Sequence, residues 1–168
     1  MESLFATYKE QIGKAEPVGD YVNDNIMTTV SMCCMEDGNK ARQSFVNTGR
    51  SYLTSLVFRY HDSFPRPEGI PLWPETIPEP TLDDIDDRIK QGFGLCGSPD
   101  EVIKQVEVYS KVGSDQLVFG VPVNMPHEDA LESIETFGKY VIPHFDKDPI
   151  HRTTRYREAA GGPLVPKD

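Results

Sequence analysis

The sequence predicts an α/β protein with a parallel β-sheet. Helical and strand patterns alternate along most of the chain, an order typical of parallel sheets covered by helices. The predicted strands are short apolar runs without polar alternation, which suits strands covered on both faces. Between residues 97 and 123 the chain reads as a turn, a helix, a second turn and a strand. Its 168 residues correspond to one domain by size.

The first predicted elements are a helix, a strand and a long second helix. Residues 4–15 place apolar side chains on one side of a helix. Residues 25–34 (NIMTTVSMCC) form a buried strand, which the acidic turn at 36–38 ends. A helix is predicted from about 39 to 60, because apolar and small residues recur there at helical spacing.

A proline-rich loop follows at residues 61–80. Its six prolines prevent regular structure. A loop of this length inside a compact domain is usually functional or disordered. Phe64 and Trp73 favour an ordered lid or an interface over disorder. A short helix is predicted over 82–90, with Thr81 as its N-cap.

The clearest local pattern begins at Ser98. Ser98 and Glu101 have the spacing of a capping box, and Pro99 stands at the first helical position. Gly113 can end this helix in a left-handed conformation. The apolar face of the helix comprises Val102, Ile103, Val106 and Tyr109.

Strands on either side of this helix complete a βαβ unit. The first is predicted at residues 93–96 and the second at 117–121. A last helix is predicted from Pro126 to about Val141, and the chain from residue 146 onward is polar. We therefore expect one domain over residues 1–158 and a disordered tail over 159–168.

Composition excludes several classes of function. The net charge of −10 argues against a nucleic-acid-binding surface, which needs a basic patch. Three cysteines do not suggest a disulfide framework, so we expect a reducing, cytoplasmic location. The amino terminus lacks a signal-peptide pattern, and no apolar run is long enough for a membrane span.

Several motifs resemble the C-terminal portion of the bacterial-luciferase-like flavin monooxygenases. They are GSPDEVIKQV from Gly97, GSDQLVFG from Gly113 and FGKYVIPHF from Phe137. The strand at 25–34, its acidic turn and the pair Ala41-Arg42 are similar to the family's pattern of strand, acidic turn and helix. The resemblance covers roughly residues 4 to 158.

The resemblance implies the C-terminal part of a (β/α)8 TIM barrel, with about three parallel strands. A complete barrel takes about 250 residues. The chain thus resembles a C-terminal fragment, a split-gene product or a subunit without its first half, which in the family carries most flavin contacts. Three strands leave two open edges, so we expect a homo-oligomer or a complementing N-terminal half as partner.

Three residues are candidate cofactor contacts. Gly97 and Ser98 lead into a helix N-terminus, which favours anions, and barrel enzymes often bind phosphate after strands seven and eight. These two residues are therefore candidates for a flavin phosphate, whereas the simpler role of Ser98 is that of a helix cap only. Gly120 either lets a cofactor approach closely or makes a turn. No catalytic residue is identified.

Cysteines and histidines offer weaker candidates. Cys33 and Cys34 end a predicted strand, and small buried side chains are their simplest role. The four histidines show no metal-ligand spacing, so we expect no metal site. His61 is notable only for its place beside the proline-rich loop.

The resemblance implies an FMN-dependent monooxygenase that uses reduced flavin and O2 on a small organic substrate. Two alternatives remain open. One is a non-catalytic remnant or interaction partner, and the other is a deazaflavin-dependent oxidoreductase on the same barrel. The substrate is not indicated by the sequence.

Overall fold

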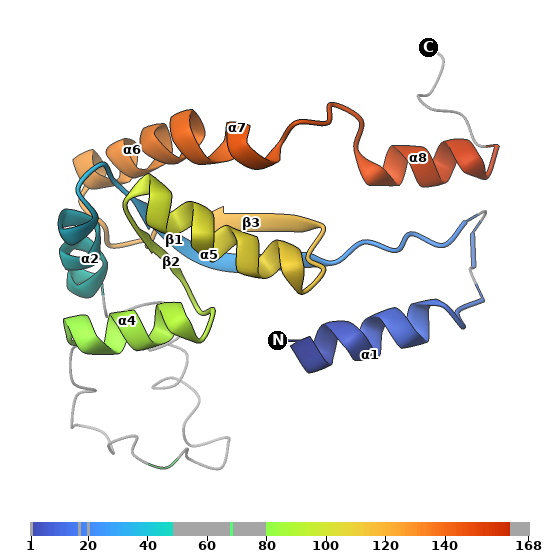
Figure 1. Ribbon diagram of the computed structural model, residues 1–168, viewed down its shortest axis with the longest axis horizontal. Helices are drawn as coiled ribbons and strands as arrows, with labels where there is room; N and C mark the ends of the chain where they lie inside the picture. Colours follow the sequence, from blue (N-terminus) through green and yellow to red (C-terminus); the bar gives the residue numbers. More distant parts are fainter. Residues whose placement is uncertain (1, 17, 20, 49–67, 69–79, 162–168) are drawn as a thin grey trace.

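The computed structural model describes residues 2–16, 18–19, 21–48, 68 and 80–161, and it confirms the α/β class (Figure 1). None of the helices in these ranges is long and apolar enough to cross a membrane. In chain order the elements are α1 (Glu2–Ile12), β1 (Met27–Cys34), α2 (Gly38–Asn47), α4 (Leu82–Lys90), β2 (Leu95–Gly97), α5 (Pro99–Lys111), β3 (Gln116–Gly120), α6 (His127–Thr136), the π-helical segment η1 (Phe137–Val141), α7 (Ile142–Phe145) and α8 (Arg152–Ala159).

The predicted strands match β1, β2 and β3 to within two residues at each end. Thr81 caps α4 as expected, because its hydroxyl accepts a hydrogen bond from the backbone N–H of Asp84 at 3.2 Å. The second half of the helix predicted over 39–60 lies outside the described residues. So do nearly all of the proline-rich loop and most of the predicted tail.

The sheet has three parallel strands in the order β2-β1-β3. β2 pairs with the end of β1, where Cys33 lies opposite Cys96. β3 pairs with the start of β1, where Thr29 lies opposite Val118. Consecutive strands are neighbours in a closed (β/α)8 barrel. Here β1 is central, because β3 pairs with the side of β1 that the preceding strand would occupy in such a barrel. The order is therefore β2-β1-β3 and not β1-β2-β3.

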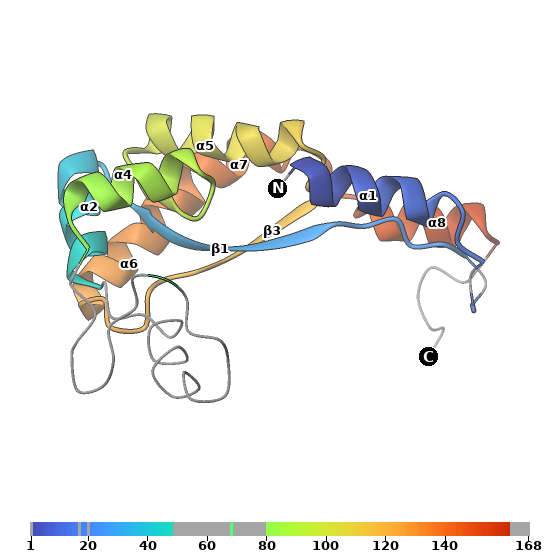
Figure 2. The same ribbon diagram turned by 90° about the horizontal axis from the view of Figure 1, so that it is seen from below.

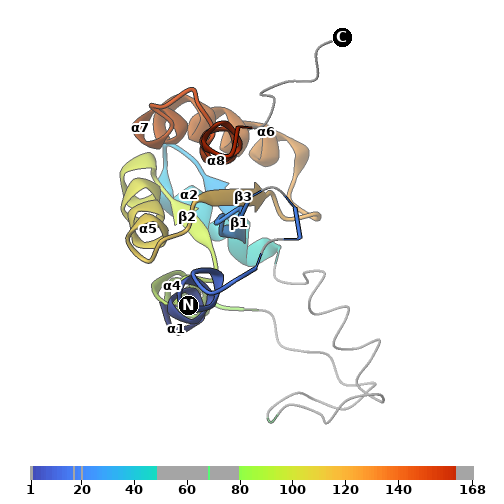
Figure 3. The same ribbon diagram turned by 90° about the vertical axis from the view of Figure 1, so that its right-hand side faces the viewer.

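Helices cover one face of the whole sheet. Figure 2 shows α5 and α7 on the same side of β1 and β3, and Figure 3 shows α6, α5 and α4 following one another around the strands. The main cluster packs the sheet against α5 and η1, and it consists of Val30, Met32, Cys34, Leu95, Val102, Val106, Tyr109, Phe137 and Val141. Burial of this helix face against the strands stabilises the βαβ unit.

A second apolar cluster covers the other face, but only at the carboxyl end of the strands. α2 and α4 supply its helical part, and its buried members are Cys33, Met35, Ala41, Phe45, Ile85, Cys96 and Met125. Toward the amino end, the same face lacks such a cover in the described part of the chain. We call this the open sheet face; it consists of the exposed residues Met27, Thr29, Ser31, Val118 and Gly120.

The expectation that the last strand is covered on both faces is therefore wrong. Phe119 lies over Phe137 with 4.2 Å between ring centroids, so one face of β3 is covered. Val118 points to the opposite face and is 46% exposed. The sequence of residues 117–119 does not reveal that one face of β3 is exposed, because the outward position is occupied by Val118 and not by a polar residue.

The expectation of two open sheet edges is wrong only for the part of the edge that β2 forms. Cys96 has its backbone groups directed away from β1, since Leu95 and Gly97 direct theirs toward it. The Gln105 side chain accepts from the Cys96 N–H at 2.9 Å and donates to the Cys96 carbonyl at 2.8 Å. One amide thus takes the place of a neighbouring strand and closes the β2 edge.

The β3 edge has no such closure. Leu117 and Phe119 direct their backbone N–H and C=O groups away from β1, and no hydrogen bond from a described residue reaches them. β3 is the last strand of the sheet on this side. The β2 strand is therefore closed by a side chain and β3 is not. On the β2 side, β1 is paired only at Met32–Cys34, so its amino half has no strand there among the described residues.

One helix, α8, arises in the polar segment after residue 146, where the sequence analysis predicted no helix. α8 has no buried residue. Arg152 at its start forms ion pairs with Asp115 and with Asp24, which lie beside the amino ends of β3 and β1. Charge pairing thus attaches a helix that lacks an apolar stripe, which explains why hydrophobic periodicity did not reveal it.

Candidate functional site

The turn between β2 and α5 holds two of the three predicted cofactor contacts. Gly97 ends β2 and is buried, and Ser98 is the N-cap of α5. Both the backbone N–H and the hydroxyl of Ser98 donate to one carboxylate oxygen of Glu101, at 2.8 and 2.9 Å. The anion at this helix N-terminus is therefore the protein's own side chain.

Arg42 on α2 completes this turn. Its guanidinium donates to Glu101 at 2.6 Å and to Asp86 at 3.0 Å. The hydrogen bond from Arg42 is the main reason why the pKa of Glu101 falls to about 2, and the bonds from Ser98 contribute. The same contacts raise the pKa of Arg42. Glu101 and Arg42 thus remain ionised together and join α2 to α5.

Two glycines make room for the Glu101 carboxylate. A Cβ atom on Gly38 would lie 2.5 Å from a carboxylate oxygen of Glu101, and one on Gly97 would lie 2.6 Å from it. Gly97 also has φ of +138°, which side chains other than glycine rarely adopt. Gly38 and Gly97 therefore let another group come close to the backbone, and in this structure that group is the Glu101 carboxylate.

The hollow beside this turn has an acidic character. It measures about 580 Å³ and is lined by Asn39, Arg42, Gln43, Leu82, Asp83, Asp86 and Glu101. Three carboxylates face a single guanidinium there, so the hollow favours cations over phosphate. In this conformation the turn accommodates a phosphate only if Glu101 moves away. Ser98 and Arg42 would then be the donors that hold it.

Gly120 lies apart from the turn. It ends β3 opposite Ser31, whereas Gly97 lies opposite Cys34 across the other edge of β1. The offset of three residues and two strand spacings corresponds to about 14 Å. Gly120 has open space around its Cα and a negative φ, so no tight turn requires a glycine there. The structure therefore does not bring Gly120 together with Gly97 and Ser98.

The three thiols are buried under α2 and α5. Cys33, Cys34 and Cys96 are all free and fully buried. Burial raises the pKa of Cys34 to about 12. A hydrogen bond to Cys33, together with burial, raises the pKa of Cys96. Thiols with a raised pKa, such as those of Cys34 and Cys96, are poor nucleophiles. The full burial of Cys33 and Cys34 agrees with the small-residue role expected for them.

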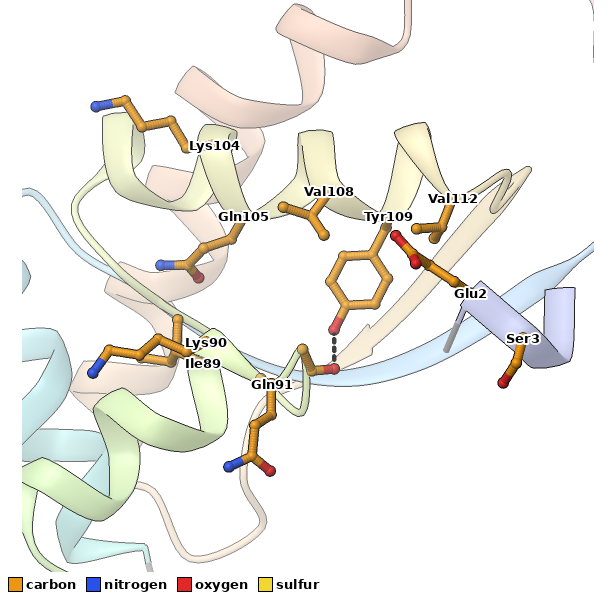
Figure 4. A pocket seen from close by; sticks show the side chains of 12 residues that line it. Glu2, Ser3, Ile89, Lys90, Gln91, Lys104, Gln105, Val108, Tyr109 and Val112 are labelled. Atoms are coloured by element: carbon orange, nitrogen blue, oxygen red, sulfur yellow. Dashed lines mark hydrogen bonds between the residues drawn. The ribbon is translucent and has the colours of Figure 1, made fainter. Parts of the chain in front are cut away.

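A shallow groove opens between α5, the turn after α4 and the start of α1 (Figure 4). It measures about 690 Å³, and its walls include Ile89, Val108, Tyr109 and Val112. The Tyr109 hydroxyl, which is the central polar group in Figure 4, donates to the Gly92 carbonyl at 2.5 Å. None of the predicted site residues lines this groove. The Tyr109 hydroxyl has a structural role there, because it joins α5 to the turn at Gly92.

No group of three or more metal-ligating side chains occurs in the described ranges. His127, His144 and His151 lie apart on α6, on α7 and before α8. His151 accepts from the Thr153 N–H at the start of α8, a capping role. His61 lies outside the described residues.

Sequence reasoning missed the partners at the turn. Glu101 was identified as a capping residue, but its bond to Arg42 joins residues 59 positions apart. The Ala41-Arg42 pair in the motif after β1 was the feature of the sequence that could have indicated Arg42 as a partner of Glu101. Gln105 carried no signal, because a polar residue on a helix usually faces solvent.

Sequence comparison finds two partial similarities, and no protein-family model matches the chain. A 61-residue stretch is 36% identical to the 5,10-methylenetetrahydromethanopterin reductase of Methanopyrus kandleri, and it covers 36% of this chain and 17% of that enzyme. A 59-residue stretch is 36% identical to the enzyme of the same name from Archaeoglobus fulgidus, with 35% and 17% covered. Less than a fifth of each relative is thus matched.

Structural comparison gives a similarity of wider extent. Monooxygenase RslO1 from Streptomyces bottropensis superposes with a TM-score of 0.54 and 18% identity, over 86% of this chain and 37% of that one. Identity at this level indicates a shared fold alone. The fold is consistent with part of a TIM barrel, and the comparisons together support a relationship at the level of the luciferase-like superfamily.

Proposed function

We propose that this chain contributes the C-terminal part of a luciferase-like oxidoreductase that uses a flavin-type cofactor. The observation that carries the proposal is the 36% identity to two reductases, within a chain whose fold resembles part of a monooxygenase. The turn between β2 and α5 supports it, because its backbone and Arg42 of α2 would form an anion site once Glu101 moves away.

Two chemistries are candidates for the whole protein. The motif resemblance favours an FMN-dependent monooxygenase, in which reduced flavin and O2 act on a small organic substrate. The names of the two relatives favour a reductase, and the family's deazaflavin-dependent members carry out such hydride transfer. When bound, either cofactor supplies the redox chemistry, and the protein binds and orients it.

In this proposal the residues of the β2–α5 turn hold the phosphate end of the cofactor. Gly97 lets the backbone come close, Ser98 donates its N–H and hydroxyl, and Arg42 supplies the positive charge. Glu101 competes for the same donors, so the chain alone binds FMN weakly. The complete site requires walls from a partner or a complementing N-terminal half, since ligand sites enclose most of the ligand.

A cofactor titration tests this role of the turn. Wild type and the variants Glu101→Gln, Ser98→Ala and Thr81→Ala are titrated with FMN and with a deazaflavin, and cofactor fluorescence is followed. Thr81→Ala is the matched control, because it also removes a helix cap, but the Thr81 hydroxyl bonds Asp84 and none of the residues of the turn. We expect Glu101→Gln to bind more tightly than wild type, Ser98→Ala less tightly, and the control unchanged.

The preferred cofactor distinguishes the two chemistries. Tighter binding of FMN supports the monooxygenase, and tighter binding of the deazaflavin supports the reductase. If neither wild type nor Glu101→Gln shows saturable binding up to millimolar concentration, the cofactor role of the turn is wrong. The non-catalytic remnant would then be the better account of the chain.

A further inference from the structure

We propose that a second copy of this chain pairs with the β3 edge, so that the two β3 strands run antiparallel about a two-fold axis at Val118. The proposal concerns the partner and rests on the sheet alone, whichever cofactor the protein uses.

The first argument is the contrast between the two edges. Gln105 bonds both outward backbone groups of Cys96, so the β2 edge has no free donor or acceptor in the strand. The outward groups of Leu117 and Phe119 on β3 have no partner among the described residues. An exposed strand edge of this kind is a template for an added strand.

The second argument is charge. The chain carries a net charge of −10, so two copies repel each other over most of their surface. The residues of the open sheet face beside this edge are uncharged, and so is Gln116, which lies half-buried on the same face opposite Met27. Val118 and Met27, which are 46% and 58% exposed, make its apolar centre. Pairing at this edge therefore places the two open sheet faces side by side, with Val118 next to its symmetry mate and no carboxylates opposed on those faces.

The third argument is register. β3 spans Gln116–Gly120, so the antiparallel register that uses its full length is centred on Val118. In that register Leu117 of each copy exchanges hydrogen bonds with Phe119 of the other. Val118 and its symmetry mate then form a non-hydrogen-bonded pair, with Cα atoms about 4.5 Å apart. A two-fold contact of this kind closes on itself.

Charge variants at the axis provide the test. Wild type, Val118→Glu and Val118→Lys are measured by light scattering after size-exclusion chromatography and by analytical ultracentrifugation. We expect a wild-type dimer, and a rise of about 100-fold or more in the dissociation constant for each variant alone, because like charges meet at the axis. An equimolar mixture of the two variants should restore a one-to-one dimer.

Two further variants make the result specific. Val108→Glu on α5 is the matched control, since Val108 is similarly exposed at 52% but lies away from β3. It should leave the dimer unchanged. Thr29→Glu on β1, one strand away from the axis, should weaken the dimer by less than about 10-fold. Far-UV circular dichroism checks that each variant is folded.

Two results would overturn the proposal. A wild-type chain that is monomeric across the micromolar range has no such interface. A dimer that persists in Val118→Glu, or that is lost equally in Val108→Glu, uses another surface.

Discussion

The two halves of the sheet are built from similar apolar runs but end differently. At the carboxyl half, Gln105 bonds the outer edge of Cys96, and the Ser133 hydroxyl accepts from the Cys34 N–H at 2.8 Å. At the amino half, the outward groups of Leu117 and Phe119 have no partner in the described ranges. A polar side chain from a neighbouring helix thus decides whether a strand edge is closed.

The largest expected difference between the halves is in the cost of truncating a side chain. Leu95 in β2 is fully buried in the main cluster, whereas Val118 in β3 is 46% exposed. We expect Leu95→Ala to lower the free energy of unfolding by about 3 kcal/mol, since it leaves a cavity. Val118→Ala should cost less than about 1 kcal/mol. Urea denaturation followed by circular dichroism measures both, and similar losses would show that the open half is covered.

The next effect concerns the closed edge itself. Gln105→Met keeps the length of the side chain but leaves the Cys96 N–H and carbonyl without partners. We expect a loss of about 2 kcal/mol, the cost of unsatisfied buried groups. Gln43→Met is the control, because Gln43 is exposed and its one bond, to Asn47, measures 3.4 Å. Equal stability of the two variants would mean that the amide does not close the edge.

A smaller effect is expected at the caps of the two helices that flank β2. Ser98→Ala should destabilise the fold by about 1 kcal/mol, a typical cost of a lost cap. Thr81→Ala removes the equivalent residue of α4 and should cost about the same. Thermal melts with and without FMN compare them. A loss of FMN affinity in Ser98→Ala that exceeds its loss of stability would indicate a cofactor contact.

The smallest effect is the pH dependence of the ion pair beside the closed half. Because the pKa of Glu101 is about 2 in the folded chain and ordinarily 4.5, its stabilisation is complete above about pH 4.5. That contribution is lost as the pH falls toward 2. Glu101→Gln should therefore show a smaller fall in melting temperature between pH 6 and pH 3. The side chain is partly exposed, so added salt should reduce the difference.

Local patterns in the sequence predicted most of the elements correctly. Ser98–Glu101 and Thr81–Asp84 have capping spacing, and the buried face of α5 follows helical periodicity. Gly113 ends that helix region with φ of +94° as expected. Each of these features depends on residues that lie within one or two helical turns of each other in the sequence. The local sequence is therefore sufficient to predict them.

Features that depend on distant contacts were not predicted. The central place of β1 requires pairing of residue 27 with residue 116. The exposure of Val118 depends on which helices cover the sheet, and the run 117–119 is apolar throughout. α8 depends on ion pairs from Arg152 to Asp24 and Asp115. The candidate site shows the same limit, since the cap at Ser98 was predicted but the link from Glu101 to Arg42 was not.

The position of Gln105 also limits how far this protein can polymerise. A sheet that accepts a neighbour on both sides can add copies without end, which is how fibrils grow. In this chain the Gln105 amide occupies the outer backbone groups of Cys96, so another strand has no free groups to bond at β2. If two copies pair at the β3 edge as proposed, this amide disfavours further growth of the sheet at β2. One glutamine on a helix would then act against fibre formation, in addition to its contribution to folding.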